Sequence, residues 1–268
     1  MEVAIQPAPT SRSQDRVFVA VRIRPLSQKE VEAGASTPCV VTSGESKVLI
    51  HKEGKPGAAL RSQRKQENEY AFDAAFPPTA SQDEVYRGTA ANHVLDVLEG
   101  INVTIMAYGA TGAGKTHTMM GSTRREHPSN GASIGNTGAN TAEGIIPQAL
   151  VDIFAAVRAR KAPCESSSAS STGEGTPSSY NISISYCEVY NEQCYDLLNP
   201  TGASLKVLED ATKGKVEVHG LSEKSVSTPE EVLNHLRVGN QNRTVSLHSG
   251  GDPDKIPLST AAESFCFF

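Results

Sequence analysis

Eight consecutive residues near the middle of the chain have the types and spacing that bind phosphate. They match the pattern G-x-x-x-x-G-K-[ST] and are Gly109, Ala110, Thr111, Gly112, Ala113, Gly114, Lys115 and Thr116. The glycines let the backbone wrap so that successive N–H groups face phosphate oxygens, and a helix that begins there adds its positive end. Lys115 would reach the β- and γ-phosphates, and the Thr116 hydroxyl would be a ligand of Mg²⁺. The pattern therefore predicts a site for the phosphates of a nucleotide with Mg²⁺.

The apolar run before this loop favours a phosphate site over a chance glycine-rich turn. Residues 103–108 (VTIMAY) have the length of a strand, and their continuous apolar character predicts a central parallel strand covered on both faces. Strand, loop and helix then follow in the order that the phosphate-binding pattern requires. The pattern alone leaves open which family of nucleotide-binding enzymes the chain resembles.

Three helices are predicted from their caps and their apolar spacing. Ser81 can cap a helix over 82–98, with Glu84 at its third position and Gly100 closing it. Apolar residues at helical intervals predict a second helix over 145–160. Thr228 and Pro229 open a third, which we expect to end before Gly239.

Strands and loops fill the rest of the chain. Strands are predicted over 17–23 and 181–190, the second leading into a short helix through Leu198, and a hairpin over 40–50 turns at Gly44. Polar or low-complexity composition predicts a flexible N-terminal segment and three inserted loops, at residues 1–15, 51–69, 121–144 and 163–179.

Composition and charge exclude several classes of protein. The 268 residues carry 25 Lys and Arg against 30 Asp and Glu, and a net charge of −5 argues against a general nucleic-acid binder. No apolar segment approaches the roughly 20 residues that span a bilayer, and the N-terminus does not resemble a secretory signal, so we expect a cytoplasmic protein without membrane insertion. Five scattered cysteines without a C-x-x-C pair predict free thiols rather than a zinc site or a disulfide framework.

Around the phosphate loop, six ordered blocks of sequence resemble the kinesin motor domain. They cover most of the chain from Arg16 to Arg243 and read VAVRIRPL (19–26), YAFDAAFPPTASQDEVY (70–86), AYGATGAGKTHTMMG (107–121), GIIPQAL (144–150), YCEVYNEQCYDLLNP (186–200) and GNQNR (239–243). The resemblance implies an α/β, P-loop NTPase-type fold with a mixed, mostly parallel central sheet flanked by helices. The loop residues Ala-Thr-Gly-Ala (110–113) and the basic segment at 51–69 are most similar to those of the kinesin-8 group.

The resemblance also assigns nucleotide-binding roles outside the phosphate loop. It implies that Arg22, Arg24 and Pro25 line the pocket for the base, where an Arg plane and a Pro ring can stack. By itself, Arg22 could equally be an exposed charge at a strand end. His117 is implied to lie against the nucleotide, although a histidine at a helix start is more often a capping or solvent-facing group. Tyr86 could pack at the base or anchor its own helix, and we favour the anchor.

Microtubules are the partner that the resemblance implies. It places 205–210 in a peripheral hairpin that touches tubulin, where Lys206, Lys213 and Lys215 would meet an acidic surface. The same location argues against residues 205–210 being the strand that holds Mg²⁺ in other P-loop enzymes. Three acidic residues, Glu188, Glu192 and Asp196, are interpreted as solvent-facing and helix-end charges rather than as acid–base catalysts.

Two sequence patterns of a complete kinesin are absent from these 268 residues. Neither the Asn-x-x-Ser-Ser-Arg-Ser-His switch nor the Asp-Leu-Ala-Gly-x-Glu switch occurs, so we expect residues 16–268 to be a partial motor domain, incomplete at its C-terminus, with reduced hydrolysis and motility. The leading hypothesis is a part of an ATP-dependent, microtubule-associated motor of the cytoskeleton. A non-motile nucleotide- or tubulin-binding regulator and an unrelated P-loop enzyme are the alternatives, and the oligomeric state is left open.

Overall fold

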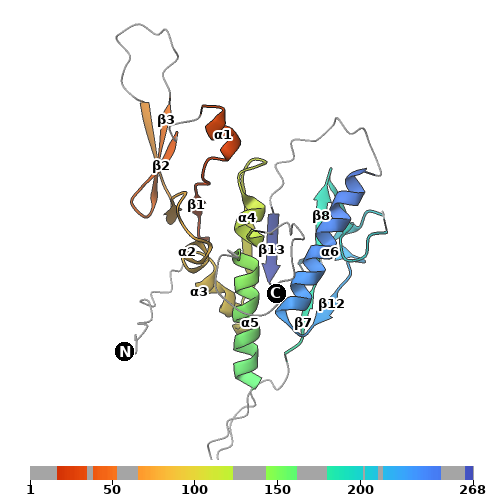
Figure 1. Ribbon diagram of the computed structural model, residues 1–268. Coiled ribbons are helices and arrows are strands. Elements are labelled where there is room, and N and C mark those ends of the chain that lie inside the picture. The colour runs from red at the N-terminus through yellow and green to blue at the C-terminus, as the bar shows by residue number, and fades with distance from the viewer. Residues whose placement is uncertain are drawn as a thin grey trace, which may run out of the picture. The chain divides into compact units, whose positions relative to one another are not determined.

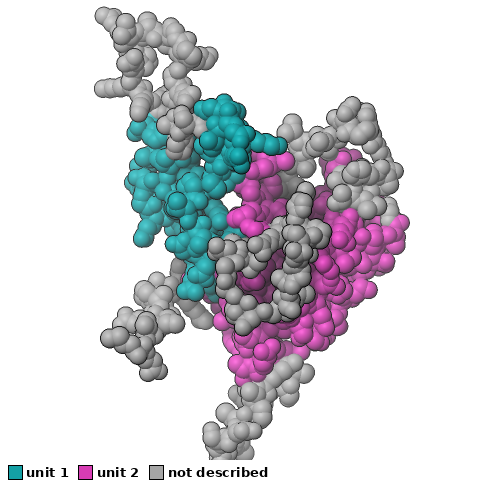
Figure 2. Space-filling model, in the orientation of Figure 1, with its two compact units in different colours: residues 1–91 teal, residues 92–268 magenta. Residues whose placement is uncertain are grey.

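The computed structural model in Figure 1 describes residues 17–34, 39–52, 66–122, 143–161, 180–201, 203–210, 214–248 and 263–267. The predicted flexible segment 1–15 and loop 163–179 lie outside the described residues, as do 53–65 and 123–142 within the other two predicted loops. The chain divides into two units, residues 1–91 and 92–268, coloured teal and magenta in Figure 2. Helices and strands occur in both units, as expected of a mixed α/β chain.

Unit 1 contains a three-stranded antiparallel sheet. Its strands are β2 (Val40–Ser43), β3 (Lys47–Lys52) and β4 (Gln66–Ala71), in the order β2-β3-β4. The hairpin between β2 and β3 turns at Gly44, whose φ of +73° favours glycine, so the predicted hairpin is confirmed. Strands β3 and β4 extend into both ends of the segment 51–69, which we predicted as loop throughout.

A short parallel pair and two helices complete unit 1. Strand β1 (Ala20–Arg22) pairs in parallel with β5 (Ala74–Phe76) and is shorter than the predicted 17–23, and helix α1 (Gln28–Glu32) follows β1. Helix α2 (Gln82–Arg87) has the predicted capping box: the Ser81 hydroxyl accepts from Glu84 N at 3.1 Å, and the Glu84 carboxylate accepts from Ser81 N at 2.7 Å.

The helix predicted over 82–98 is broken into three pieces. After α2 come α3 (Ala91–Val94) and the 3₁₀ helix η1 (Leu95–Glu99), and Gly100 at φ +79° ends η1 as predicted. The first break is at Gly88, where a methyl group would lie 2.8 Å from the Phe76 ring. The apolar spacing that predicted one helix continues through 82–98. It gives no information on the contact between Gly88 at the end of α2 and the Phe76 ring.

In unit 2, strand β6 (Val103–Ala107) leads into α4 (Lys115–Met120), which packs against the long helix α5 (Ile145–Lys161). Helix α5 confirms the predicted helix 145–160 and buries one apolar side, made of Ile146, Ala149, Leu150, Ile153, Phe154 and Val157. At its C-terminal end, Arg160 donates to Leu98 O at 3.1 Å and pairs with Glu99, which ties α5 to η1.

Strand β6 differs from its prediction. It pairs antiparallel with β13 (Glu263–Phe267), a strand that we did not predict, and its side chains alternate between partly buried and exposed, with Met106 61% exposed. The prediction of a parallel strand covered on both faces is therefore wrong for the described residues. The apolar run satisfied the sequence pattern, but only Val103, Ile105 and Ala107 point to the more buried face.

The remaining strands form three antiparallel pairs. Strand β7 (Ile182–Ile184) pairs with β12 (Lys224–Val226), β8 (Cys187–Tyr190) with β9 (Gln193–Asp196), and β10 (Lys206–Asp210) with β11 (Lys215–His219). The predicted short helix through Leu198 is wrong, because β8 and β9 form a two-residue hairpin. Asn191 and Glu192 have φ values of +50° and +62°, the backbone of a type I′ turn that matches strand twist.

Helix α6 (Pro229–His248) begins as predicted but runs past Gly239. The Thr228 hydroxyl accepts from Glu231 N at 3.2 Å, which confirms the predicted cap. Gly239 does not end the helix; instead it packs against the Tyr186 ring, since a methyl group there would lie 2.4 Å from Tyr186 Cδ1. In the described part of the chain, no helix is both long and apolar enough to cross a membrane.

Replacing Gly239 by alanine should destabilise the protein. The helix itself gains up to about 1 kcal/mol from alanine, but forcing a methyl group against Tyr186 costs about 1–3 kcal/mol. We expect a lower midpoint in urea unfolding followed by circular dichroism. Gln241→Ala, at an exposed position of the same helix, should change the free energy of unfolding by less than about 0.5 kcal/mol. A Gly239→Ala protein as stable as the parent would contradict the close contact.

Candidate phosphate-binding site

The predicted phosphate loop lies between β6 and α4, with its glycines in the conformations that such a loop needs. Gly112 and Gly114 have φ values of +79° and +94°, and Gly114 is the N-cap residue of α4. Ala113 N donates to Ala110 O at 3.0 Å, which closes a turn inside the loop. Residues 110–113 are exposed, so the loop backbone is open to a ligand in solution. An anion can thus reach backbone N–H groups at the start of α4.

Lys115 holds the loop from within. Its ammonium nitrogen Nζ donates to Gly109 O at 2.9 Å and to Ala110 O at 3.2 Å. These two carbonyl oxygens come from the first two residues of the loop, so the side chain spans the loop from the start of α4 back to the loop's first residue. The ammonium group therefore lies beside the exposed loop backbone, where an anion would bind.

The loop is supported from behind by the junction of α4 with α5. Gly121 at the end of α4 forms a β-bridge with Glu143, and Gln148 Nε2 of α5 donates to Glu143 O at 2.7 Å. A methyl group at Gly144 would lie 2.5 Å from Gly121 N and from the Met119 carbonyl. Both ends of the predicted insertion 121–144 are thus fixed against the helix that follows the phosphate loop.

Thr116 and His117 occupy the first turn of α4, and both are exposed. The Nε2 of His117 lies 3.4 Å from the Ser122 hydroxyl. Thr116 presents one hydroxyl next to the loop, and Mg²⁺ usually takes one or two protein ligands and completes its shell with water and phosphate oxygens. The residues present fit a phosphate ligand with Mg²⁺. The roles of Thr116 and His117 stay predictions.

The three residues predicted to line the base pocket lie in unit 1. The half-buried Arg22 donates to Gln82 Oε1 at 2.6 Å, and burial lowers the pKa of its guanidinium. Arg24 makes a bidentate pair with Glu30, at 2.7 Å and 2.5 Å, and donates to Pro25 O at 3.0 Å. The hydrogen-bonding edges of both guanidinium groups are thus engaged with protein, and the base contacts stay a prediction.

Sequence analysis missed the partners of these arginines. Glu30 belongs to a capping box with Ser27, since its carboxylate accepts from Ser27 N at 2.7 Å, and the spacing Ser27-x-x-Glu30 could have revealed it. No sequence signal pointed to Gln82, which is buried at the start of α2. Tyr86, in the same helix, is 4% exposed, as expected of the helix anchor that we favoured.

Asp196 has a structural role that differs from the predicted solvent-facing charge. It is 7% exposed and accepts from Leu198 N, Asn199 N and Ser222 N at 2.8, 3.1 and 2.9 Å. Burial alone raises the pKa of Asp196, but these bonds and the Ser222 side chain outweigh it, so the pKa is lowered. The carboxylate fixes the turn after β9, whereas Glu192 is exposed at the hairpin tip as predicted.

Glu188 is also partly buried rather than solvent-facing. Its Oε1 lies 3.2 Å from Arg243 Nε, and burial raises the pKa of Glu188 although Arg243 opposes this shift. Arg243 donates to the Tyr186 hydroxyl at 3.0 Å and lies 5.8 Å from the ring centre, while Tyr186 donates to Asn240 Oδ1 at 2.8 Å. These contacts fasten α6 to the β8–β9 hairpin.

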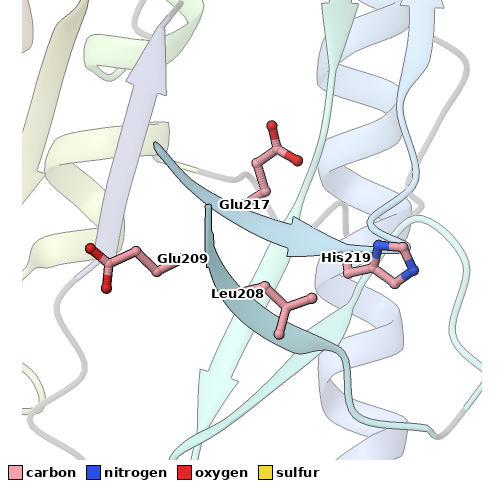
Figure 3. Close-up of a pocket in the computed structure, with 4 residues that line it drawn as sticks. All are labelled: Leu208, Glu209, Glu217 and His219. Atoms are coloured by element: carbon pink, nitrogen blue, oxygen red, sulfur yellow. The ribbon is translucent and has the colours of Figure 1, made fainter. Parts of the chain in front are cut away.

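The hairpin predicted to touch tubulin forms as β10 and β11. A depression on it, about 280 Å³ in volume, is lined by Leu208, Glu209, Glu217 and His219, whose side chains are drawn in Figure 3. The two carboxylates project from different strands and away from each other. Lys206 is exposed, whereas Lys213 and the Lys215 side chain lie outside the described residues. In the described ranges, no three His, Cys, Asp or Glu side chains are grouped to hold a metal ion.

Comparison with known proteins extends these observations. The family model of the kinesin motor domain matches residues 22–250. The chain is 34% identical over 229 residues to kinesin-like protein KIF19 of Homo sapiens and 38% identical over 229 residues to kinesin-like protein KIN-8A of Oryza sativa subsp. japonica. Each match covers 85% of this chain but only 20% and 25% of those relatives. A solved structure of a fast kinesin matches 87% of this chain and 55% of its own, with 28% identity and a TM-score of 0.66.

Replacing Lys115 by methionine should weaken nucleotide binding. The change keeps the length of the side chain but removes the ammonium group, and one charged hydrogen bond contributes about 1.5–3 kcal/mol, or at least about tenfold in affinity. Titration with a fluorescent ATP analogue and Mg²⁺ measures the loss. Lys206→Met, on the exposed hairpin, should bind like the parent. Equal affinities for all three proteins would contradict the assignment of this loop.

Asp196→Asn should destabilise the protein near neutral pH. The folded pKa of Asp196 is lowered, so the ionised carboxylate adds stability above the unfolded pKa and loses it as pH falls through the folded pKa. We expect a deficit of about 1–3 kcal/mol at pH 7 that narrows below about pH 4. Unfolding of both proteins across this pH range gives the comparison, with the exposed Glu192→Gln as control. A deficit independent of pH would show that the charge is not responsible.

Proposed function

The chain belongs to the kinesin motor domain family, and on that premise we propose that it binds Mg-ATP as the nucleotide-binding part of a microtubule-based motor. The predicted P-loop NTPase-type α/β fold is confirmed by the match to a solved kinesin motor. One observation carries the proposal: the exposed loop Gly109–Thr116, held between β6 and α4 with Lys115 inside it. The chain spans about a fifth to a quarter of the curated relatives compared above, so the activity of a whole motor is part of the proposal.

Within this proposal, the chain's residues bind and orient the nucleotide phosphates. Backbone N–H groups of Gly112 and of Gly114 to Thr116 donate to phosphate oxygens, which the left-handed conformations of Gly112 and Gly114 make possible. Lys115 exchanges its bonds to Gly109 O and Ala110 O for bonds to the β- and γ-phosphates. Thr116 directs its hydroxyl to Mg²⁺, which, when bound, neutralises charge on the phosphates.

The base is proposed to stack rather than to form hydrogen bonds at the N-terminal element. Arg24 uses its edges on Glu30 and on Pro25 O, so what it can offer a base is its flat face, next to the Pro25 ring. Arg22 contributes in the same way from its place beside Gln82. His117 is proposed to lie against the nucleotide from the first turn of α4.

Hydrolysis requires more than this loop. A water must be positioned and the charge that develops on the transferred phosphoryl group must be neutralised, and neither switch pattern occurs in these 268 residues. We therefore propose that residues 1–268, taken alone, bind Mg-ATP or Mg-ADP but turn ATP over slowly.

Microtubules of the cytoplasmic cytoskeleton are the proposed partner. The β10–β11 hairpin projects exposed apolar side chains, Val207, Leu208 and Val216, together with the exposed Lys206. Contact through charges on this hairpin would weaken as salt is added, because exposed charge pairs are screened. A non-motile regulator would bind microtubules through the same surface without responding to nucleotide.

Two measurements on purified 1–268 test the proposal. We expect binding of a fluorescent ATP analogue that depends on Lys115, and cosedimentation with microtubules that falls when Lys206 is replaced by glutamate and when salt is raised. Phosphate release should stay near the background with or without microtubules. Microtubule-stimulated turnover would overturn the proposed loss of hydrolysis, whereas no nucleotide binding at all would overturn the proposed site. Microtubule binding that is identical with ATP, with ADP and without nucleotide would favour the regulator.

A further inference from the structure

Three side chains with complementary chemistry lie in one row across the β2-β3-β4 sheet of unit 1, far in sequence from the phosphate loop. Cys39 stands opposite His51, because His51 N donates to Cys39 O at 2.8 Å and the next pair in the ladder is Val40 with Ile50. His51 stands opposite Glu67 in the ladder of β3 with β4. Directly opposite residues point to the same face, with Cβ atoms about 4.5–5.5 Å apart. The sheet therefore sets a thiol, an imidazole and a carboxylate side by side.

The imidazole of His51 lies beside the carboxylate of Glu67. Its Nδ1 is buried and makes no hydrogen bond among the described residues, while Glu67 Oε1 lies 3.3 Å from it, at ion-pair distance. A buried ring nitrogen without a hydrogen bond is rare and calls for an explanation. A carboxylate can only accept, so the proton of the neutral ring belongs on Nδ1 and leaves Nε2 as the proton acceptor.

The other edge of the ring lies on the side of the sheet where Cys39 stands opposite His51. Nδ1 and Cδ2 lie on opposite sides of the ring, so an Nδ1 that faces β4 turns the edge formed by Cδ2 and Nε2 toward β2. Cys39 is exposed, whereas Cys187 is partly buried and Cys194 buried. Among the described residues, the other charged side chains of this face, Lys47 and Glu69, pair with each other at 2.7 Å. Of the described carboxylates on this face, Glu67 is the one at ion-pair distance from His51.

We propose that Cys39 is a nucleophilic thiol that forms mixed disulfides with small disulfides, with His51 as the base and Glu67 as a positioning residue. The Cys39 proton moves to His51 Nε2, and the thiolate attacks one sulfur of the disulfide. A new S–S bond forms as the old one breaks, and the leaving thiolate carries away the electron pair. Glu67 balances the positive charge that His51 gains.

The test measures modification of Cys39 by a small aromatic disulfide, resolved from the other cysteines by mass spectrometry of peptides. An ordinary thiol is only a few per cent ionised near neutral pH, so a neighbouring base can raise its rate by about five- to tenfold. We expect native Cys39 to react faster than Cys39 in the urea-unfolded chain by about that factor. His51→Ala should abolish the advantage, and added imidazole should restore part of it.

Glu67→Gln should slow the reaction by about two- to fivefold because the ring loses its orienting partner. Glu67→Asp should keep part of the rate. Glu69→Gln is the matched control, since Glu69 lies on the same strand and face but pairs with Lys47, and it should react like the parent. The thermal midpoint of each variant confirms that it is folded. An unchanged rate in folded His51→Ala, or a native rate no higher than the unfolded one, would overturn the proposal.

Discussion

The bonds from the Lys115 ammonium group to Gly109 O and Ala110 O are the interaction on which the proposed site depends. A loop that turns its N–H groups outward gathers carbonyl oxygens on its other side, and a cation between them relieves that concentration of negative charge. The same cation then stands beside the place where an anion binds. The loop that follows strand β6 supplies both carbonyls, and α4, fixed to α5 through the Gly121 and Glu143 bridge, supplies the lysine.

Features whose cause is local could be predicted from the sequence. The phosphate loop, the caps at Ser81 and Thr228 and the terminator Gly100 all form as expected, because a few neighbouring residues determine each of them. Helix α5 could also be predicted, since its buried apolar residues recur at helical intervals along the helix. The family resemblance, which rests on blocks spread over most of the chain, is confirmed by the match over residues 22–250.

Features that depend on distant contacts could not be predicted. Gly239 resembles a helix stop, but its place in α6 is decided by the Tyr186 ring, over 50 residues earlier in the chain. Asp196 resembles a surface charge, and Ser222 and the turn after β9 make it a buried acceptor. The edges of Arg22 and Arg24 are committed to Gln82 and Glu30, which composition does not reveal. The predicted position of strand β6 is confirmed, but its predicted parallel direction is wrong, because an apolar run does not specify the direction of the neighbouring strand.

The most direct test of the central claim is hydrogen–deuterium exchange of the whole chain with and without Mg-ADP, read at single amides. If the loop binds phosphate, the amides of Gly112 and of Gly114 to Thr116 should gain protection on adding Mg-ADP, because their N–H groups become donors to phosphate oxygens. Amides of the β10–β11 hairpin should not change. Unchanged exchange at Gly112 and at Gly114 to Thr116 under saturating Mg-ADP, with protection elsewhere, would contradict the account.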